Sequence, residues 1–120
     1  MEAQMLETKR SFLVFKYNKY TTVPTRNIAF FYMKYEKPLI MSFDRQEYPV
    51  QYSLRQIQDM VTDKQFFRLN KQYLINFDAV KEVEHYFARK LLVRLIIDAP
   101  EPLLVAKEKA TCFLQWLENR

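Results

Sequence analysis

The first half of the chain alternates between short apolar runs and polar corners. Runs rich in aromatic and β-branched residues occupy positions 12–17, 20–23, 28–35, 39–43 and 48–52. Runs of this length, separated by turn-forming residues, predict β-strands. The first two runs are joined by Asn18-Lys19, which predicts a hairpin.

The pattern changes to helical spacing at Ser53. Leu54, Ile57 and Met60 fall on one face of a helix. Ser53 and Gln56 have the spacing of a capping box, in which each side chain satisfies a backbone N–H at the helix start. The sequence therefore predicts one helix near the middle of the chain.

The C-terminal third predicts two more strands and a second helix. Positions 90–97 alternate weakly, which indicates a strand buried on most of both faces, and a short strand follows at 103–106. Positions 107–118 have helical spacing, and the inward residues are predicted to be Ala110, Phe113, Leu114 and Leu117, with Trp116 beside them. Seven or so strands with a mid-chain and a C-terminal helix predict a mainly β, antiparallel domain.

Length and composition favour one folded domain spanning 1–120, with a core of about 10–117. The apolar fraction of 49% is high enough for a hydrophobic core. No apolar run has the length of a membrane span, and the first residues do not resemble a secretory signal. With Cys112 as the single cysteine, we expect a cytoplasmic protein.

Glycine is absent from the sequence. Phosphate-cradling loops and dinucleotide fingerprints both need glycine, so these nucleotide-binding classes are excluded. Turns that need a positive φ are then expected to use Asn or Asp. The candidates are Asn18, Asp44 and Asn76.

Catalytic chemistry finds little support in the sequence. His85 is the only histidine, so neither a histidine-based metal cluster nor a proton shuttle between two histidines can form. Cys112 is predicted to pack on its helix, and Glu82 and Glu84 share a face of an extended segment without an apolar pocket that would separate their pKa values. We therefore expect no enzyme, no metal site and no cofactor.

Charge points instead to an anionic partner. The net charge is +5 at pH 7, and a basic surface favours binding to nucleic acid without identifying it. The aromatic residues Phe30, Phe31, Tyr32 and Tyr35 could stack single-stranded bases. Consecutive bulky residues in a strand fill a sheet core more often, and that interpretation is the favoured one.

A polar corner interrupts the apolar pattern between Leu69 and Tyr73. Its residues are Asn70, Lys71 and Gln72. Lysine can donate to guanine, and Asn or Gln can pair with adenine, so such side chains suit the edges of DNA bases.

Two further groups of cations complete the candidate site. Lys107 and Lys109 stand at the start of the last helix, where cations oppose the helix dipole and need a partner such as phosphate. Lys37 lies in the turn between two predicted strands, and Lys81 is a further cation near a predicted turn.

The segment from Phe66 to Asn76 resembles the signature of the LytTR family, roughly Phe-x-Arg-x-His-Arg-Ser-Tyr-x-Val-Asn. Phe66, Arg68, Tyr73 and Asn76 match outright. The matches in kind are Lys71 and Ile75, whereas Asn70 replaces His and Gln72 replaces Ser. One of Phe66 and Phe67 is expected to point inward and the other to cover the helix that begins at Ser53.

Other segments resemble the family in the same order. Ile28 heads a strand similar to Asp-Ile-x-Tyr-Ile-Glu, and Ser53-Leu54 is similar to the start of the family's Ser-Leu helix. Lys107 occupies the Arg position of a Val-Ser-Arg helix start, and Ala106 lacks the Ser hydroxyl. A Lys can hold phosphate but lacks the planar fork of Arg.

The resemblance implies an elongated β domain that binds double-stranded promoter DNA. Loops at one edge would enter successive major grooves, commonly on direct repeats, and a homodimer on DNA would be compatible. It implies a bacterial cytoplasmic transcription regulator, often with an N-terminal receiver domain of a two-component system. These 120 residues contain no receiver, so the chain is an excised effector domain or works without one. An RNA-binding or single-strand-binding β module remains the alternative.

Overall fold

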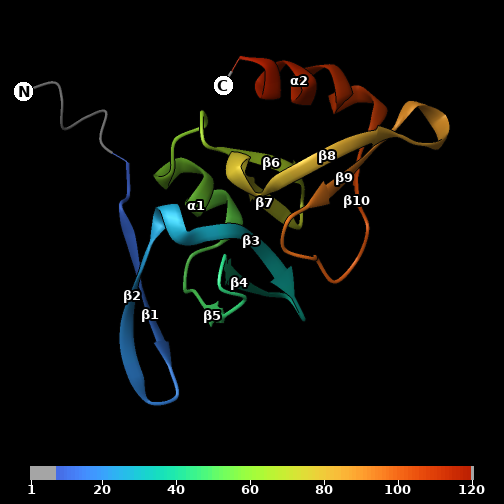
Figure 1. Ribbon diagram of the computed structural model, residues 1–120. Helices are drawn as coiled ribbons and strands as arrows, with labels where there is room; N and C mark the ends of the chain where they lie inside the picture. The colour runs from blue at the N-terminus through green and yellow to red at the C-terminus, as the bar shows by residue number, and fades with distance from the viewer. Residues whose placement is uncertain (1–7, 120) are drawn as a thin grey trace, which may run out of the picture.

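The computed structural model describes residues 8–119, which form ten strands and two α-helices (Figure 1). The fold is mainly β, as predicted. The helices are α1 (Leu54–Met60) and α2 (Lys107–Glu118), and short 3-10 turns lie at Thr25–Asn27, Phe77–Ala79 and Phe87–Arg89. The strands are β1 (Ser11–Lys16), β2 (Lys19–Pro24), β3 (Ile28–Lys34), β4 (Lys37–Ser42), β5 (Glu47–Pro49), β6 (Phe66–Asn70), β7 (Tyr73–Asn76), β8 (Val80–His85), β9 (Leu91–Leu95) and β10 (Leu103–Val105).

The strands form three antiparallel sheets in a body of 44 × 39 × 23 Å. The central sheet has the order β5-β4-β3-β7-β6, the second has the order β10-β9-β8, and β1 and β2 form a separate hairpin. The hairpin projects away from the rest of the domain, and α2 lies on the opposite side (Figure 1). The central sheet therefore separates the hairpin from α2.

Two hydrophobic clusters fill the two faces of the central sheet because strand side chains alternate. Phe30 and Tyr73 belong to the cluster under β9, β10 and α2. Phe31 and Leu74 belong to the cluster under α1 and the hairpin. These strands are buried on both faces, which confirms the core interpretation of Phe30, Phe31 and Tyr32. For Tyr35 that interpretation is wrong, because it lies in the β3–β4 turn and is exposed.

The adjacent residues Phe66 and Phe67 follow the same alternation. Phe66 packs in the cluster of α1, whereas Phe67 lies 5.2 Å from the Phe113 ring and 5.1 Å from the Trp116 ring, measured between ring centroids. As expected, one residue of the pair, Phe66, packs against the helix that begins at Ser53. The other, Phe67, packs against α2.

Both helices begin where the sequence predicts. The side chain of Ser53 accepts from the Gln56 backbone N–H, and the side chain of Gln56 accepts from the Ser53 N–H, so the capping box is present. On α2 the predictions for Cys112 and Leu114 are wrong, since both are exposed. Each is rotated about 100° from the buried Phe113, and only one stripe of α2 meets the sheet.

Three strands go beyond the seven predicted from the apolar runs. The polar corner at 66–76 is the β6–β7 hairpin, and β8 has no two-residue apolar alternation because its residues are largely exposed. β9 is buried on one face only, because Arg94 points to solvent from the uncovered face of its sheet. The expectation of burial on both faces of this strand is wrong.

Positive φ angles occur at seven residues of the described chain, and only one of them is a predicted candidate, Asn18. Asp44 and Asn76 instead use their side-chain oxygens to accept hydrogen bonds from the backbone N–H two residues further on. The two-residue turns at Tyr17-Asn18 and Tyr35-Glu36 have positive φ at both positions, as type I′ hairpin turns do, and this chain places bulky residues there. The other six are Tyr17, Tyr35, Glu36, Arg45, Ala88 and Arg89.

Candidate nucleic-acid interface

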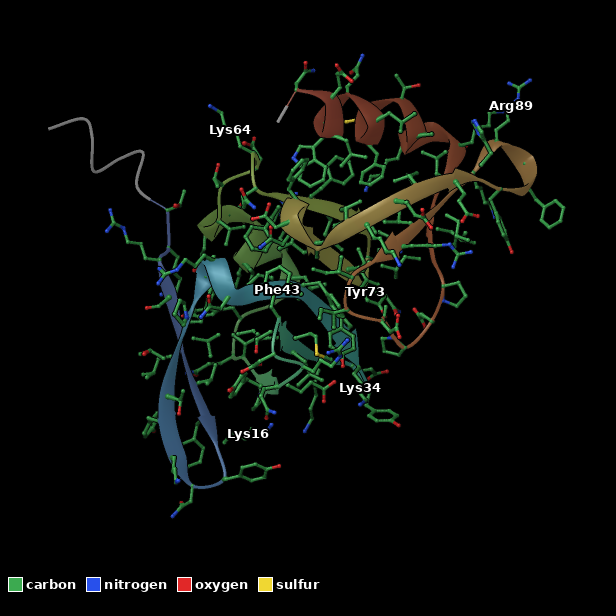
Figure 2. All side chains as sticks on the ribbon, viewed as in Figure 1. Lys16, Lys34, Phe43, Lys64, Tyr73 and Arg89 are labelled. Carbon is green, nitrogen blue, oxygen red and sulfur yellow. The ribbon has the colours of Figure 1, made fainter. Side chains whose placement is uncertain are left out.

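Two hairpin turns lie side by side at one end of the central sheet. β3 runs antiparallel to β7, with Tyr32 opposite Tyr73, and the Met33 N–H donates to the Gln72 carbonyl over 3.0 Å. The β3–β4 turn follows Lys34, and the β6–β7 turn precedes Tyr73, so antiparallel pairing puts both turns at the same end. Figure 2 shows Lys34 and Tyr73 on this side of the molecule.

Arg68 holds the β6–β7 turn through hydrogen bonds to two of its backbone carbonyls. Its Nε donates to the Asn70 carbonyl over 2.7 Å, and its Nη2 donates to the Lys71 carbonyl over 2.9 Å. The side chain of Asn70 accepts from the Gln72 backbone N–H over 2.8 Å. Because the turn's carbonyls face Arg68, the Lys71 and Gln72 side chains are left exposed. The Asn70 side chain takes part in the turn itself.

The start of α2 is tied to the same turn. The Lys109 Nζ donates to the Arg68 carbonyl over 2.9 Å and to the Leu69 carbonyl over 3.4 Å. These carbonyls are the partner that a cation near a helix N-terminus requires. Lys107, two residues earlier, is exposed. We call the surface formed by Lys37, Asn70, Lys71, Gln72 and Lys107 the basic end.

Lys37 differs from its neighbour Lys34 across the β3–β4 hairpin. The two lysines are directly opposite in the strand register. The Lys34 Nζ lies 3.6 Å from a carboxylate oxygen of Glu47, so its charge is partly compensated. Lys37 is exposed and has no ion pair among the residues that the structure describes.

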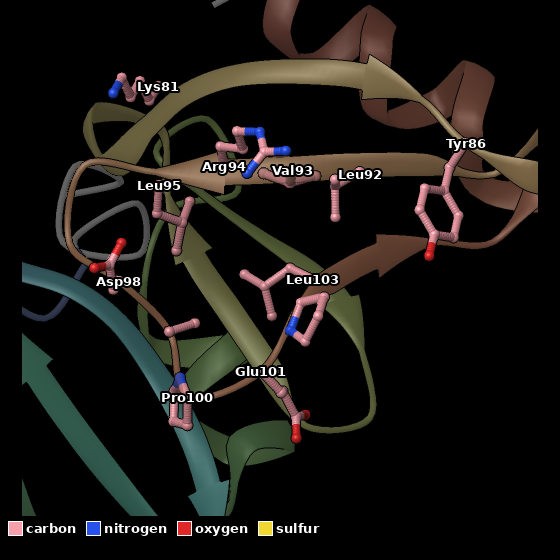
Figure 3. Close-up of a pocket in the computed structure, with 12 residues that line it drawn as sticks. Lys81, Tyr86, Leu92, Val93, Arg94, Leu95, Asp98, Pro100, Glu101 and Leu103 are labelled. Carbon is pink, nitrogen blue, oxygen red and sulfur yellow. The ribbon is translucent and has the colours of Figure 1, made fainter.

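Sequence reasoning missed the β8–β9 turn as a neighbour of the basic end. Leu91 at the start of β9 pairs with Val105, two residues before α2, so this turn lies beside the start of α2. Arg89 and Lys90 are exposed there, and Figure 2 shows Arg89 near that helix end. The basic pair at the start of the strand predicted over 90–97 was the available signal. Lys81 lies at the other end of β8, as Figure 3 shows.

Burial shifts two pKa values near the β6–β7 turn. The pKa of Tyr73 is raised to about 12, chiefly by burial and further by the negative charge of Glu101. The pKa of Arg68 is lowered, again chiefly by burial and then by the like charge of Arg55. Tyr73 therefore stays a neutral phenol, and Arg68 lies in a region of positive potential.

A hollow of about 630 Å³ on the second sheet has no arrangement suited to catalysis (Figure 3). The charged residues that line it carry both signs and are Lys81, Arg94, Asp98 and Glu101. Arg94 also lies 2.7 Å from Glu84 and 3.8 Å from Glu82 on β8, and its hydrogen bond lowers the pKa of Glu84. Within residues 8–119 no group of three His, Cys, Asp or Glu side chains could hold a metal ion. His85 is exposed.

Turns and a helix start gather cations at one end of the central sheet, and comparison with known proteins identifies the family. The family model of the LytTr DNA-binding domain matches residues 18–118. The chain therefore belongs to the LytTR family, which is a DNA-binding and not a catalytic family.

A solved structure agrees with this assignment at the level of the fold. It is the LytTr DNA-binding domain of a Bacillus cereus protein described as a methyl-accepting/DNA response regulator. The similarity has a TM-score of 0.77 at 17% identity and covers 91% of this chain and 97% of that one. Among curated proteins, none matches the chain. Across residues 8–119, no helix is long and apolar enough to cross a membrane.

Proposed function

We propose that this chain binds duplex DNA in a sequence-specific manner, as the effector domain of a bacterial cytoplasmic transcription regulator. The observation that carries the proposal is the convergence of two hairpin turns and the start of α2 at the basic end, held together by Arg68 and Lys109. Loops on a rigid sheet are suited to reading DNA, because their side chains are exposed while the backbone is fixed.

The roles of the residues follow from their exposure. Lys71 and Gln72 are the base-reading side chains. Asn70 contributes the amide nitrogen of its side chain, because the amide oxygen accepts a hydrogen bond within the turn. Lys107 and Lys37 hold phosphates. Lys109, whose ammonium already bonds two carbonyls, mainly positions the turn and adds positive charge. Arg89 and Lys90 extend the phosphate-binding surface beside α2.

The assembly on DNA is part of the same proposal. The whole chain acts as one domain, and copies occupy direct repeats in a promoter, as a homodimer on the DNA. In the full-length protein a receiver domain of a two-component system would control this assembly. These features rest on what the family resemblance implies.

One observation supports the alternative of RNA or single-strand binding. The Tyr35 side chain is 88% exposed in the β3–β4 turn, and an exposed aromatic ring can stack a base. A stacking platform would need several such rings, whereas Phe30, Phe31 and Tyr32 are buried. Tyr35→Ala separates the alternatives, because it should abolish binding only if stacking dominates.

The test starts by selecting bound duplexes from a random DNA pool, which yields a cognate site. On that site Lys71→Ala and Gln72→Ala should each cost about 1–3 kcal/mol, with much less effect on random DNA. Lys107→Ala should weaken both DNAs alike and lower the salt slope by about one. With about four to six phosphates neutralised, the wild-type log–log slope should be roughly −4 to −5. If selection enriches no sequence, specific recognition is wrong.

A further inference from the structure

A groove of about 960 Å³ lies between α1, β6 and α2, outside the basic end. Lys64 at its rim is visible in Figure 2 near the end of α2. The volume is within the range of small-molecule sites, which are mostly apolar with a few polar groups. Neither the fold nor the DNA-binding proposal requires an open groove at this place.

The apolar wall of the groove consists of aromatic rings that are only half-buried. Phe67 and Trp116 line it, with ring centroids 5.1 Å apart. The Trp116 indole N–H donates to the Asp63 carbonyl over 2.8 Å, so its hydrogen-bonding capacity is used. What these two rings offer to the groove is therefore apolar surface.

Cations adjoin this wall, and their charge is not neutralised. Arg68 and Lys109 both line the groove, and neither forms an ion pair with a described carboxylate. Asp63 is the one acidic residue among those that line it. Burial, and after it the like charge of Arg55, lowers the pKa of Arg68.

Both cations also keep unused donors. A guanidinium has five N–H donors and an ammonium has three. Arg68 donates one hydrogen bond from each of its three nitrogens, to Gln58, Asn70 and Lys71. Lys109 donates to two carbonyls. In these bonds two donors of Arg68 and one of Lys109 are not engaged, which is enough to bind one carboxylate.

We propose that this groove binds a small organic carboxylate with an apolar body. The apolar body packs against Phe67 and Trp116, and the carboxylate accepts from Arg68 and Lys109. The charge complementarity favours an anion over a neutral ligand of the same shape, because the cations are already present and unpaired.

Binding in the groove should weaken DNA binding, a consequence that rests on the proposed function. The two cations that would hold the carboxylate also hold the β6–β7 turn through its carbonyls. A carboxylate bound to the donors that those carbonyls leave free neutralises part of the positive charge of these two side chains. It thereby lowers the positive potential beside the basic end.

The chain carries two built-in reporters for this site, because its single Trp and its single Cys, Trp116 and Cys112, both line the groove. The probe is 4-phenylbutanoate, and 4-phenylbutan-1-ol is its uncharged match. We expect 4-phenylbutanoate to change Trp116 fluorescence and to slow maleimide labelling of Cys112. The alcohol should bind at least about threefold more weakly.

Two variants test the role of charge. Lys109→Gln removes a cation and should weaken 4-phenylbutanoate by about threefold, with Lys19→Gln on the distant hairpin as the matched control. If Lys109→Gln strongly lowers the midpoint temperature of unfolding, Gln115→Glu is used in its place. Gln115 is exposed and lines the groove. A carboxylate added there should repel the probe without unfolding the domain. Neither variant should change binding of the alcohol.

The outcomes separate the site from its regulation. Equal affinity for acid and alcohol, or no protection of Cys112, overturns the carboxylate site. Binding of 4-phenylbutanoate without any change in the affinity of the selected duplex leaves the site standing and overturns the coupling. If the protein binds no DNA, the proposed function fails, and the fluorescence and labelling results still judge the groove.

Discussion

Replacing Arg68 by Gln should impair both stability and DNA recognition, although Arg68 is not placed on the DNA. The substitution removes hydrogen bonds to Asn70, Lys71 and Gln58. Bonds from a charged donor contribute about 1.5–3 kcal/mol each when buried. Arg68 is half-exposed and water can reach the freed turn, so we expect a total loss of about 2 kcal/mol in the free energy of unfolding.

The effect of Arg68→Gln on DNA binding has a separate origin. Without Arg68 the turn is mobile, and the Lys71 and Gln72 side chains must be ordered on binding. Ordering two side chains costs about 1–3 kcal/mol, which corresponds to an affinity loss of about five- to 150-fold. Fluorescence anisotropy on the selected duplex measures this loss of affinity. Urea unfolding measures the loss in the free energy of unfolding.

Arg55→Gln is the matched control for charge. Arg55 is exposed on α1 and close enough to lower the pKa of Arg68, yet no hydrogen bond joins it to the turn among those described. Its loss should weaken cognate and random DNA slightly and equally. If Arg68→Gln, still folded, binds the cognate duplex as Arg55→Gln does, the idea that Arg68 orders a reading turn is refuted.

Four further substitutions test residues in and around the site, each by urea unfolding. The folded state holds the Tyr73 proton more tightly than the unfolded state, since folding raises the pKa of Tyr73 from 10.0 to about 12. The free energy of unfolding should therefore fall between pH 10 and pH 12, by up to about 1.4 kcal/mol per pH unit. Tyr73→Phe should remove this slope. Asn76→Ala should cost about 3 kcal/mol, because the buried side chain donates to the Ile28 carbonyl and accepts from Asp78. Asn70→Ala, which frees one exposed turn bond, should cost under about 1 kcal/mol. Tyr32→Phe should be neutral or stabilise by up to about 1 kcal/mol, because the Tyr32 hydroxyl is buried and has no hydrogen-bond partner within residues 8–119. A loss above about 1 kcal/mol contradicts this.

Hydrophobic periodicity was sufficient for most elements and insufficient for others. The bounds of α2 and the capping box of α1 follow from local chemistry, so the sequence predicts them. β8 could not be found in this way, because its residues are largely exposed and show no two-residue apolar alternation. The turn residues were also missed, because Tyr35 and Glu36 adopt positive φ in a tight hairpin turn although neither residue type favours it.

The site was predictable in part for a similar reason. Phe66, Tyr73 and Asn76, which match the family signature, are buried and build the hairpin. The substituted positions, Asn70 and Gln72, are exposed. The motif therefore locates the turn but does not determine which bases it reads. The bracing role of Lys109 could not be predicted, because its carbonyl partners lie about forty residues away in the chain.

The central sheet lies between the two hydrophobic clusters, and this position has a consequence for folding cooperativity. Phe30 and Phe31 are consecutive in β3 but belong to opposite clusters. Loss of β3 would expose both clusters at once, so neither can melt while the other stays intact. Three separate sheets should therefore unfold in a single two-state transition, with equal calorimetric and van't Hoff enthalpies. DNA bound at one end of β3 would then raise the unfolding temperature of the distant hairpin as well.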